Sequence, residues 1–365
     1  MLLGVWSGWA SVLGVFILTK RDGIKKFLIV IGAASGLLAT SFGWAGSGLN
    51  GTYDTGTLTP LERQAVYGNE LFLSESEARN LENRSRAFVE QANETSDPDR
   101  DAPEAGGRVG GYNMFWIDRG DSSVSIDGKF RTSIITHPEN GRIPKMTDRG
   151  AERMERLQSQ WRLLWRSQDL AVSQNTGTAW WLENSDGKGP YDDIEQRPFA
   201  ERCIIGSRST AGPPMLPNYY NNYKRIIQTE THVMILTEMN HDARIIRLNS
   251  EHRSAGAPNW LGDSIGRWED DTLVVETVNF KEFPALAGAD KNLKVTEFFK
   301  RQTDGGLLYR FVVENPEVWS ETWQGEYSWS SSDGKLYEYA CHEGNYALGN
   351  ILRGARELEK SAARR

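Results

Sequence analysis

Cysteine and histidine are scarce in this chain of 365 residues, which has two cysteines and five histidines. No two histidines have the helical spacing of zinc ligands, so the sequence predicts no metal ion. The His-Glu pair at His342 lacks the second histidine of a zincin motif, although a metal site shared with His241 or Asp242 stays open. Cys203 and Cys341 could pair in an exported protein, and two separate buried thiols are the alternative.

Clustered positive charge is also missing. The chain has 42 Lys and Arg residues against 49 Asp and Glu residues, so its net charge is −7, and the part expected to fold contains no basic cluster. This composition argues against nucleic acid as a partner. Gly46, Gly48 and Gly51 match the spacing of G-x-G-x-x-G, but a dinucleotide site needs a strand before the first glycine, and an export signal is expected there instead. We predict no organic cofactor.

Two apolar segments, residues 2–18 and 27–44, flank a short basic cluster at the N-terminus. The basic cluster, the apolar run after it and the small residues around Ala45 are typical of a secretory signal peptide. We predict that residues 1–45 are an export signal with an upstream extension and that the mature protein is periplasmic or secreted. If the segment is not cleaved, its two apolar runs could anchor the chain as a helical hairpin, which is the one membrane contact expected.

Short strand-like segments follow one another in the second half of the chain. They are rich in β-branched and aromatic residues, and turn signals such as Asp333 and Gly334 separate them without intervening helices. The pattern predicts a mainly β fold, an antiparallel meander that forms a barrel or a sandwich, with a lipocalin-like barrel as one option. The predicted strands are 223–248 (one or two strands), 264–268, 272–280, 294–302, 307–314, 321–328 and 335–342.

Three regions are expected after the export signal: a smaller mixed α/β region at 46–200, the barrel or sandwich at 201–349, and a charged C-terminal helix or tail at 350–365. Helices are predicted from Thr59 to Ala92, because Thr59 has the properties of an N-cap, and over residues 148–166. Strands are predicted at 112–118, 123–126 and 129–136, the last two joined by a tight turn at Asp127 and Gly128.

Residues 223–248 form the longest strand-like stretch and carry several polar side chains among apolar ones. In an unbroken strand Glu238, Asn240, Asp242 and Arg244 would share one face. That face could be exposed to solvent, or it could line a cavity inside a closed sheet. A bulge near Asn240 would exchange the two faces beyond it.

Carboxylates also lie inside the later predicted strands, at Glu276, Glu297 and Glu338, with Arg310 nearby. A buried carboxylate has to be paired or hydrogen-bonded, and burial can bring its pKa into the range of general acid–base catalysis. An antiparallel sheet with one solvent-exposed face would show the same pattern, and the carboxylates would then have no functional role. We predict these four residues as ligand-binding, together with a tyrosine-rich rim at the mouth of the cavity. The rim residues are Tyr219, Tyr220 and Tyr223; a rigid connection around the sheet is the other interpretation of this proline-rich segment.

The catalytic candidates are Glu238 and His342 as acid and base, with His241, Asp242 and Arg244 orienting the substrate or stabilising charge. Ser264 matches the G-x-S-x-G motif of a nucleophile elbow, but a strand is expected after it where the motif needs a helix. A serine hydrolase is therefore only an alternative.

The segments HDARIIRL, GDSIGRWEDDTLVVETVNF and YEYACHEGNYALGNILRGAR resemble signature segments of an uncharacterised family of exported bacterial proteins, and the resemblance spans most of residues 52–356. It implies an exported, single-polypeptide bacterial protein, and no catalytic role is carried over.

We expect a small-molecule ligand. The main hypothesis is a cofactor-independent acid–base enzyme of the lyase, hydratase or isomerase type, and a non-catalytic periplasmic carrier or binding protein is the alternative. A cavity lined by convergent Glu, His and Arg would favour the enzyme, and an apolar, aromatic lining would favour the carrier.

Overall fold

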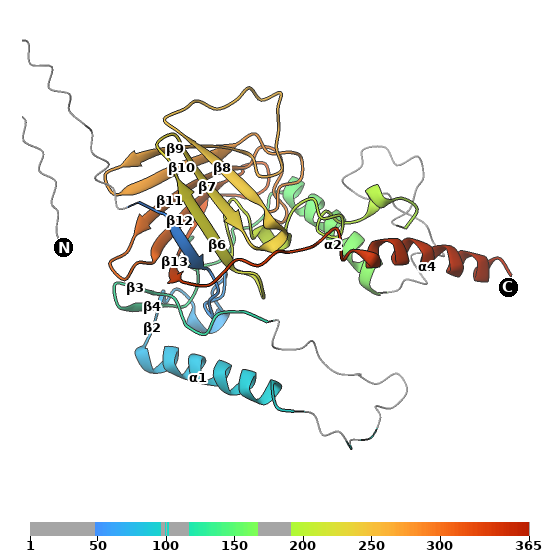
Figure 1. Cartoon of the computed structure of the whole chain (residues 1–365), viewed down its shortest axis with the longest axis horizontal. Coiled ribbons are helices and arrows are strands. Elements are labelled where there is room, and N and C mark those ends of the chain that lie inside the picture. Colours follow the sequence, from blue (N-terminus) through green and yellow to red (C-terminus); the bar gives the residue numbers. More distant parts are fainter. Residues whose placement is uncertain (1–47, 96–98, 100, 102–116, 167–190, 365) are drawn as a thin grey trace, which may run out of the picture. The chain divides into compact units, whose positions relative to one another are not determined.

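The computed structural model describes residues 48–95, 99, 101, 117–166 and 191–364 (Figure 1). The predicted export signal at 1–45 and most of the predicted strand at 112–118 lie outside these residues. Within the described part, none of the helices is long and apolar enough to cross a membrane.

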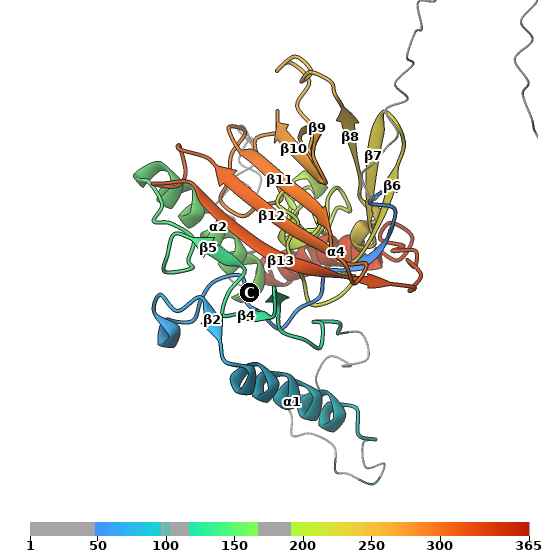
Figure 2. The ribbon, with the colours of Figure 1, turned by 90° about the vertical axis from the view of Figure 1, so that its left-hand side faces the viewer.

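A closed β-barrel forms the centre of the fold, as the sequence predicted. Its strands follow the order β1-β6-β7-β8-β9-β10-β11-β12-β13, and β1 pairs with β13 as well as with β6, which closes the ring. The strands are β1 (Gly51–Asp54), β6 (Tyr223–Gln228), β7 (His232–Thr237), β8 (Ala243–Leu248), β9 (Asp263–Glu269), β10 (Thr272–Val278), β11 (Lys294–Arg301), β12 (Leu307–Glu314) and β13 (Trp323–Ser332). Figure 2 shows β9 to β13 side by side along the curved wall.

One pair in the barrel departs from the antiparallel meander that was predicted. β8 and β9 run parallel, with Ile246 opposite Ser264. A parallel pair needs a long crossover rather than a hairpin, and residues 249–262 provide it. The prediction of a domain boundary near residue 200 also differs from the structure, because β1 belongs to the barrel and β5 (Ile135–His137) extends the same sheet beside β13.

The stretch 223–248 contains three strands, β6, β7 and β8, rather than one or two. A tight 3-10 turn at Met239–His241 separates β7 from β8, and Asn240 adopts a left-handed backbone there, with φ of 59°. Val233 and Ile235 are buried before the turn, whereas Arg244 and Ile246 are buried after it. Odd-numbered side chains therefore point into the barrel before Asn240 and even-numbered ones after it, which is the change that a bulge there would cause.

Side chains fill the inside of the barrel, including Phe299, Tyr309, Tyr327 and Trp329, none of which is exposed. The proline-rich segment before β6 also inserts a residue. Its Met215 is fully buried, the Met215 amide donates to the Tyr309 hydroxyl at 2.9 Å, and the Tyr327 hydroxyl donates to the Met215 carbonyl at 2.9 Å. This segment is a rigid plug of the barrel core, and its backbone has cis peptide bonds before Pro213 and Pro214.

Within the described residues, a small sheet and three α-helices lie outside the barrel. The sheet has the order β2-β4-β3, and the two-residue turn predicted at Asp127 and Gly128 joins β3 to β4, with positive φ at both residues. The helix predicted at 148–166 is confirmed as α2, and the C-terminal helix is confirmed as α4. The bounds are β2 (Phe72–Leu73), β3 (Ser125–Ile126), β4 (Lys129–Arg131), α1 (Glu75–Ala92), α2 (Asp148–Arg166), α4 (Tyr346–Ala362), and the 3-10 helices η1 (Ala65–Tyr67), η3 (Ile194–Gln196), η4 (Ser207–Ser209) and η5 (Met239–His241).

The predicted helix start at Thr59 is wrong. Helix α1 begins at Glu75, where Ser74 and Glu77 form a capping box. The Thr59 hydroxyl instead accepts a hydrogen bond from the Val124 amide at 2.8 Å, so this threonine fixes a loop. A capping signature depends only on residues close together in the chain. Of the two candidates, Thr59 and Ser74, the one at Ser74 marks the start of the helix.

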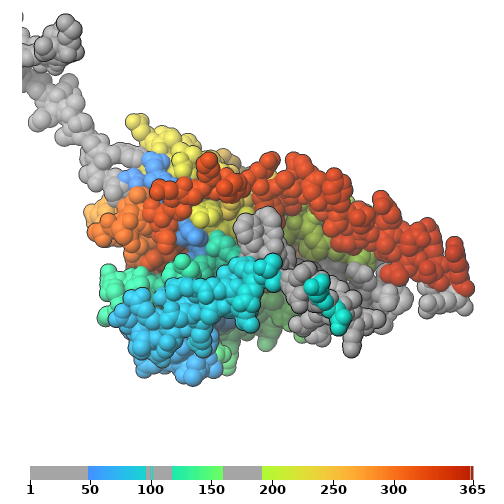
Figure 3. All heavy atoms as spheres, turned by 60° about the horizontal axis from the view of Figure 1, so that its bottom comes forward, coloured from blue at the N-terminus to red at the C-terminus, as the bar shows by residue number. Residues whose placement is uncertain are grey.

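The strand predicted at 335–342 is also wrong. Residues 333–345 form an irregular strap between β13 and α4, and in Figure 3 the orange-red C-terminal segment lies against the yellow strands. Two backbone groups of the strap are bonded to the turn after β7: the Tyr337 amide donates to Glu238 Oε1 at 3.0 Å, and the Tyr339 carbonyl lies 3.0 Å from His241 Nδ1. Cys341 of the strap forms a disulfide with Cys203.

A buried ion pair crosses the barrel interior between β8 and β11. Arg244 Nη1 lies 2.6 Å from Glu297 Oε2, and Arg244 Nη2 lies 3.0 Å from Glu297 Oε1. The Tyr309 hydroxyl also donates to Glu297 Oε1, at 2.8 Å. The side chains of Arg244 and Glu297 are 3% and 0% exposed, so removing either partner would leave a charge in an apolar interior.

We expect Arg244→Met to lower the free energy of unfolding by about 3–5 kcal/mol, because it leaves the Glu297 carboxylate uncompensated. The double variant Arg244→Met, Glu297→Gln should recover part of that loss. Urea unfolding measures both. The matched control is Arg267→Met, which breaks an exposed pair with Glu269 and should cost less than about 1 kcal/mol. A loss for Arg244→Met no larger than that of the control would contradict the structural role of the pair.

Candidate functional site

The residues predicted as site residues are distributed over several places in the structure. Arg244 and Glu297 form the interior ion pair, and their charged atoms bond each other there. Glu338 and His342 are exposed on the strap, whereas Glu238 is buried with 5% exposure. Among the described residues, no hydrogen bond or ion pair joins His342 to Glu238, which accepts a hydrogen bond from the Tyr337 amide. Their roles as acid and base stay a prediction.

Two other predicted ligand-binding residues lie on the outside of the barrel. Arg310 is exposed and its guanidinium lies 5.0 Å from the centre of the Phe298 ring. Glu276 is half-buried and belongs to a surface network in which His252 lies between two carboxylates, 3.2 Å from Glu276 and 3.1 Å from Asp263. The hydrogen bond from Lys294 is the main cause that lowers the pKa of Glu276.

The tyrosine-rich rim is dispersed as well. Tyr219 is exposed, and the guanidinium of Arg208 lies 4.9 Å from its ring centre. Tyr220 is half-buried, and Tyr223 begins β6, where burial raises the pKa of its hydroxyl. Ser264 is buried inside strand β9 with its hydroxyl 2.9 Å from the Thr277 hydroxyl, so it does not lie on a strand-to-helix turn as a nucleophile elbow requires.

Two of the predicted residues, Glu238 and Asp242, do come together, around a lysine that the sequence analysis missed. Lys224 lies on β6 with 0% exposure, and Glu238, Asp242 and Asp54 are its carboxylate neighbours. Its Nζ makes no hydrogen bond to another described residue. Lys224 is two residues before the buried Ile226, so the two-residue period of a strand was the available signal that this side chain points inward.

Burial shifts the pKa of several groups in this cluster. It lowers the pKa of Lys224 to about 7, although the negative charge of Glu238 opposes the shift. Burial also raises the pKa of Asp54 to about 6 and that of Asp242 above its ordinary value, despite a hydrogen bond of 2.8 Å from the Gly206 amide to Asp242. Such shifts are common at functional sites, but buried ion clusters with a purely structural role show them too.

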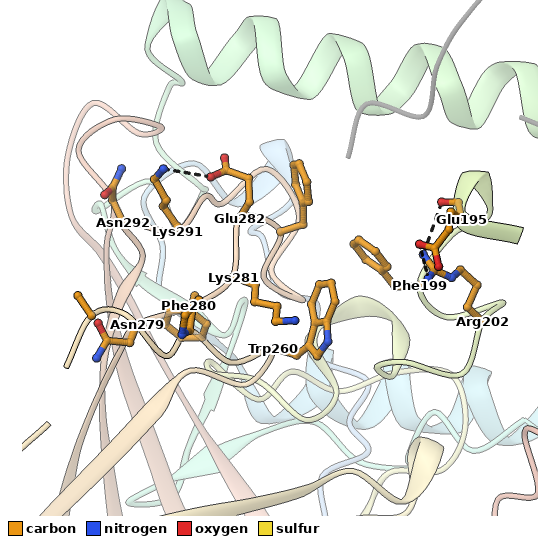
Figure 4. Close-up of a pocket in the computed structure, with 13 residues that line it drawn as sticks. Glu195, Phe199, Arg202, Trp260, Asn279, Phe280, Lys281, Glu282, Lys291 and Asn292 are labelled. Atoms are coloured by element: carbon orange, nitrogen blue, oxygen red, sulfur yellow. Dashed lines mark hydrogen bonds and ion pairs between the residues drawn. The ribbon is translucent and has the colours of Figure 1, made fainter. Parts of the chain in front are cut away.

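A cavity of about 620 Å³ lies outside the barrel, where three loops meet (Figure 4). The first loop is the crossover 249–262, the second is the connection 279–293 between β10 and β11, and the third spans residues 195–202. The Asn259 amide donates to the Asn279 carbonyl at 3.0 Å, and the Lys281 amide donates to the Asn259 carbonyl at 3.0 Å. This backbone pairing holds the first two loops together and sets Trp260 beside Lys281. The volume lies within the range of about 300–1,000 Å³ found for ligand sites.

Aromatic rings form the walls of this pocket, and cations lie over them. The centre of the Phe199 ring is 4.6 Å from that of Trp260 and 6.3 Å from that of Phe283. Lys281 Nζ lies 4.6 Å from the Trp260 ring centre, and Figure 4 shows the two side chains together. The guanidinium of Arg202 lies 5.9 Å from the Phe199 ring centre. These cation–π contacts place positive charge beside the aromatic walls of the pocket.

Among the described residues, two cations around the pocket have an ion-pair partner and a third has none. Arg202 is bonded to Glu195 at 2.7 Å, and Lys291 lies 3.6 Å from Glu282. Lys281 is half-buried and forms no ion pair with a carboxylate among the described residues. It is therefore the cation of this pocket that is available to an anionic ligand.

The described residues contain no group of three or more His, Cys, Asp and Glu side chains arranged to hold a metal ion. Comparison of the chain with protein-family models, curated proteins and solved structures finds no match. The resemblance to a family of exported bacterial proteins therefore remains a prediction, and function has to be argued from the geometry of the sites.

The buried amine of Lys224 should make stability depend on pH between about 7 and 9. The unfolded chain holds this proton up to the ordinary pKa of 10.5, whereas the folded protein releases it near 7. In this window the unfolded state binds more protons, so the free energy of unfolding rises with pH, by about 2–3 kcal/mol from pH 7 to pH 9.

The variant Lys224→Met should lack this rise, and urea unfolding at pH 6.5, 7, 8 and 9 measures it. Lys300→Met, which removes an exposed lysine paired with Asp271 on the same barrel, is the control and should follow the unmodified protein. Identical slopes for Lys224→Met and the unmodified protein would show that Lys224 keeps its proton up to high pH.

Proposed function

We propose that this chain is a non-catalytic binding protein for a small molecule that has an apolar body and one negatively charged group. The observation that carries the proposal is the half-buried ammonium of Lys281, which lies on the Trp260 ring inside a cavity of about 620 Å³ and has no carboxylate partner among the described residues. A ligand carboxylate or phosphate beside Lys281 would make a charge-assisted hydrogen bond, and its apolar body would pack against the aromatic wall that Trp260 and Phe199 form together.

The architecture supports binding more than catalysis. Ligand pockets combine apolar and aromatic walls with polar groups that orient the ligand, and this pocket has Phe199, Trp260 and Phe283 beside several charged and amide side chains. Neither Glu238 nor His342, the acid and base candidates from the sequence, is among the residues that line this pocket. The barrel interior is filled by side chains and does not supply an alternative chamber around Glu297.

Export is part of the proposal. Disulfides persist in oxidising compartments, so the bond between Cys203 and Cys341 supports a periplasmic or secreted protein. A carrier in such a compartment would need neither an organic cofactor nor a metal ion.

Acid–base chemistry at the Lys224 cluster is the second candidate, and the pKa of about 7 is the observation that favours it. A general base works best when its pKa lies near the working pH. The test of this candidate is an NMR measurement in D2O of proton–deuterium exchange at the α-carbon of simple ketones. Catalysed exchange that is lost in Lys224→Met would support the enzyme, and the absence of exchange with the unmodified protein would remove it.

Calorimetric titration with a panel of aromatic carboxylates, such as benzoate and naphthoate, tests the binding function. Lys281→Met should weaken binding by about 10- to 100-fold, because a hydrogen bond to a charged group contributes about 1.5–3 kcal/mol. Trp260→Leu should weaken it as well, through loss of the stacking surface.

Lys291→Met is the matched control, since this lysine lines the same pocket but is paired with Glu282, and its effect should stay within about threefold. Equal losses for Lys281→Met and Lys291→Met would indicate attraction by net charge alone and would reject the assignment of Lys281.

A further inference from the structure

A second cavity, of about 530 Å³, adjoins the pocket described above, and its lining is almost entirely apolar. It lies between helix α2, the loop 198–208 and the connection 283–289. Its apolar lining residues are Leu157, Pro198, Phe199, Ala200, Ile205, Phe283, Pro284, Ala285, Leu286, Ala287 and Ala289. Arg208 is the one charged residue among the described residues that line it. A cavity of this composition disfavours a charged or strongly polar occupant and suits a hydrocarbon.

The two cavities share a wall made of two aromatic side chains. Phe199 and Phe283 line both cavities, with their ring centres 6.3 Å apart and an angle of 32° between the ring planes. On one side of this pair lie Trp260 and Lys281, and on the other lie Leu286 and Ala285. A ligand that passes the ring pair would have one end beside a cation and the other end in an apolar chamber.

We propose that the two cavities together form one divided site for a linear carboxylate, with the carboxylate group at Lys281 and the alkyl chain in the apolar cavity. The inference rests on the proposed function, since it needs an anion at Lys281, and it specifies the body of the ligand. The alkyl chain would cross the boundary that Phe199 and Phe283 form between the two cavities.

Charge complementarity favours this orientation over the reverse one. Lys281 has no ion-pair partner among the described residues and lies beside Trp260 within the first cavity. Arg208 is exposed, and its guanidinium is held on the Tyr219 ring at 4.9 Å, at the edge of the apolar cavity. A carboxylate at Arg208 would leave Lys281 without an anion and would direct the hydrocarbon toward the charged residues of the first pocket.

The test is calorimetric titration of the full chain with hexanoate, octanoate, decanoate and dodecanoate, each below its micelle concentration, and with benzoate as the short aromatic probe. Each methylene that enters the apolar cavity should tighten binding by about fourfold. Ala285→Leu, which fills part of the apolar cavity, should weaken decanoate at least tenfold and leave benzoate within twofold. Ala347→Leu, an exposed alanine of α4, is the size-matched control and should change neither ligand.

The outcomes separate this inference from the function on which it rests. If neither benzoate nor any alkyl carboxylate binds, the proposed function fails and this inference fails with it. If benzoate binds through Lys281 but affinity does not rise with chain length, or Ala285→Leu weakens all ligands equally, the binding function stands and the divided site is rejected. Decanoate binding that is lost in Arg208→Gln but kept in Lys281→Met would overturn the orientation.

Discussion

Closure of the barrel by a four-residue strand is the constraint on which the rest of the structure depends. β1 pairs with β6 on one side and with β13 on the other, so it joins the two ends of the chain of strands. An open sheet would leave two edges with unpaired backbone groups, and closure removes both edges. The closed ring also excludes water from its interior, which makes the Arg244–Glu297 pair a buried interaction and leaves no solvent around the amine of Lys224.

The proposed binding site lies outside the barrel because the interior is already occupied. Aromatic side chains and the inserted Met215 fill the space that an empty barrel would offer to a ligand. The parallel pairing of β8 with β9 has a second consequence, because its crossover 249–262 has to return along the barrel to the end where β9 begins, and there it meets the connection 279–293. The backbone hydrogen bonds between these two loops bring Trp260 to Lys281, so the pocket follows from the topology of the sheet.

Local patterns predicted the elements whose signals lie within a few residues. The Asp127-Gly128 turn, helix α2 and the individual barrel strands are of this kind, because turn chemistry and side-chain periodicity act over short distances. The predictions failed where two local signals competed, as at Thr59 and Ser74, and where tertiary contacts override a strand pattern, as in the strap, whose backbone bonds Glu238 and His241. The site prediction selected polar residues within strands, but several of these satisfy each other inside the barrel or face solvent.

The sequence by itself determined that the chain is rich in β-strands, where its turns lie, and that side chains alternate between the two faces of each strand. These features depend on residue type and on neighbours in the chain. Only the tertiary structure decided that Cys203 meets Cys341, that Arg244 meets Glu297, and that Lys224 is surrounded by carboxylates. It also decided that Phe199, Trp260 and Lys281, from three separate loops, form one pocket. Strand order and crossover direction bring these residues together, and neither is encoded in the spacing of residues along a single segment.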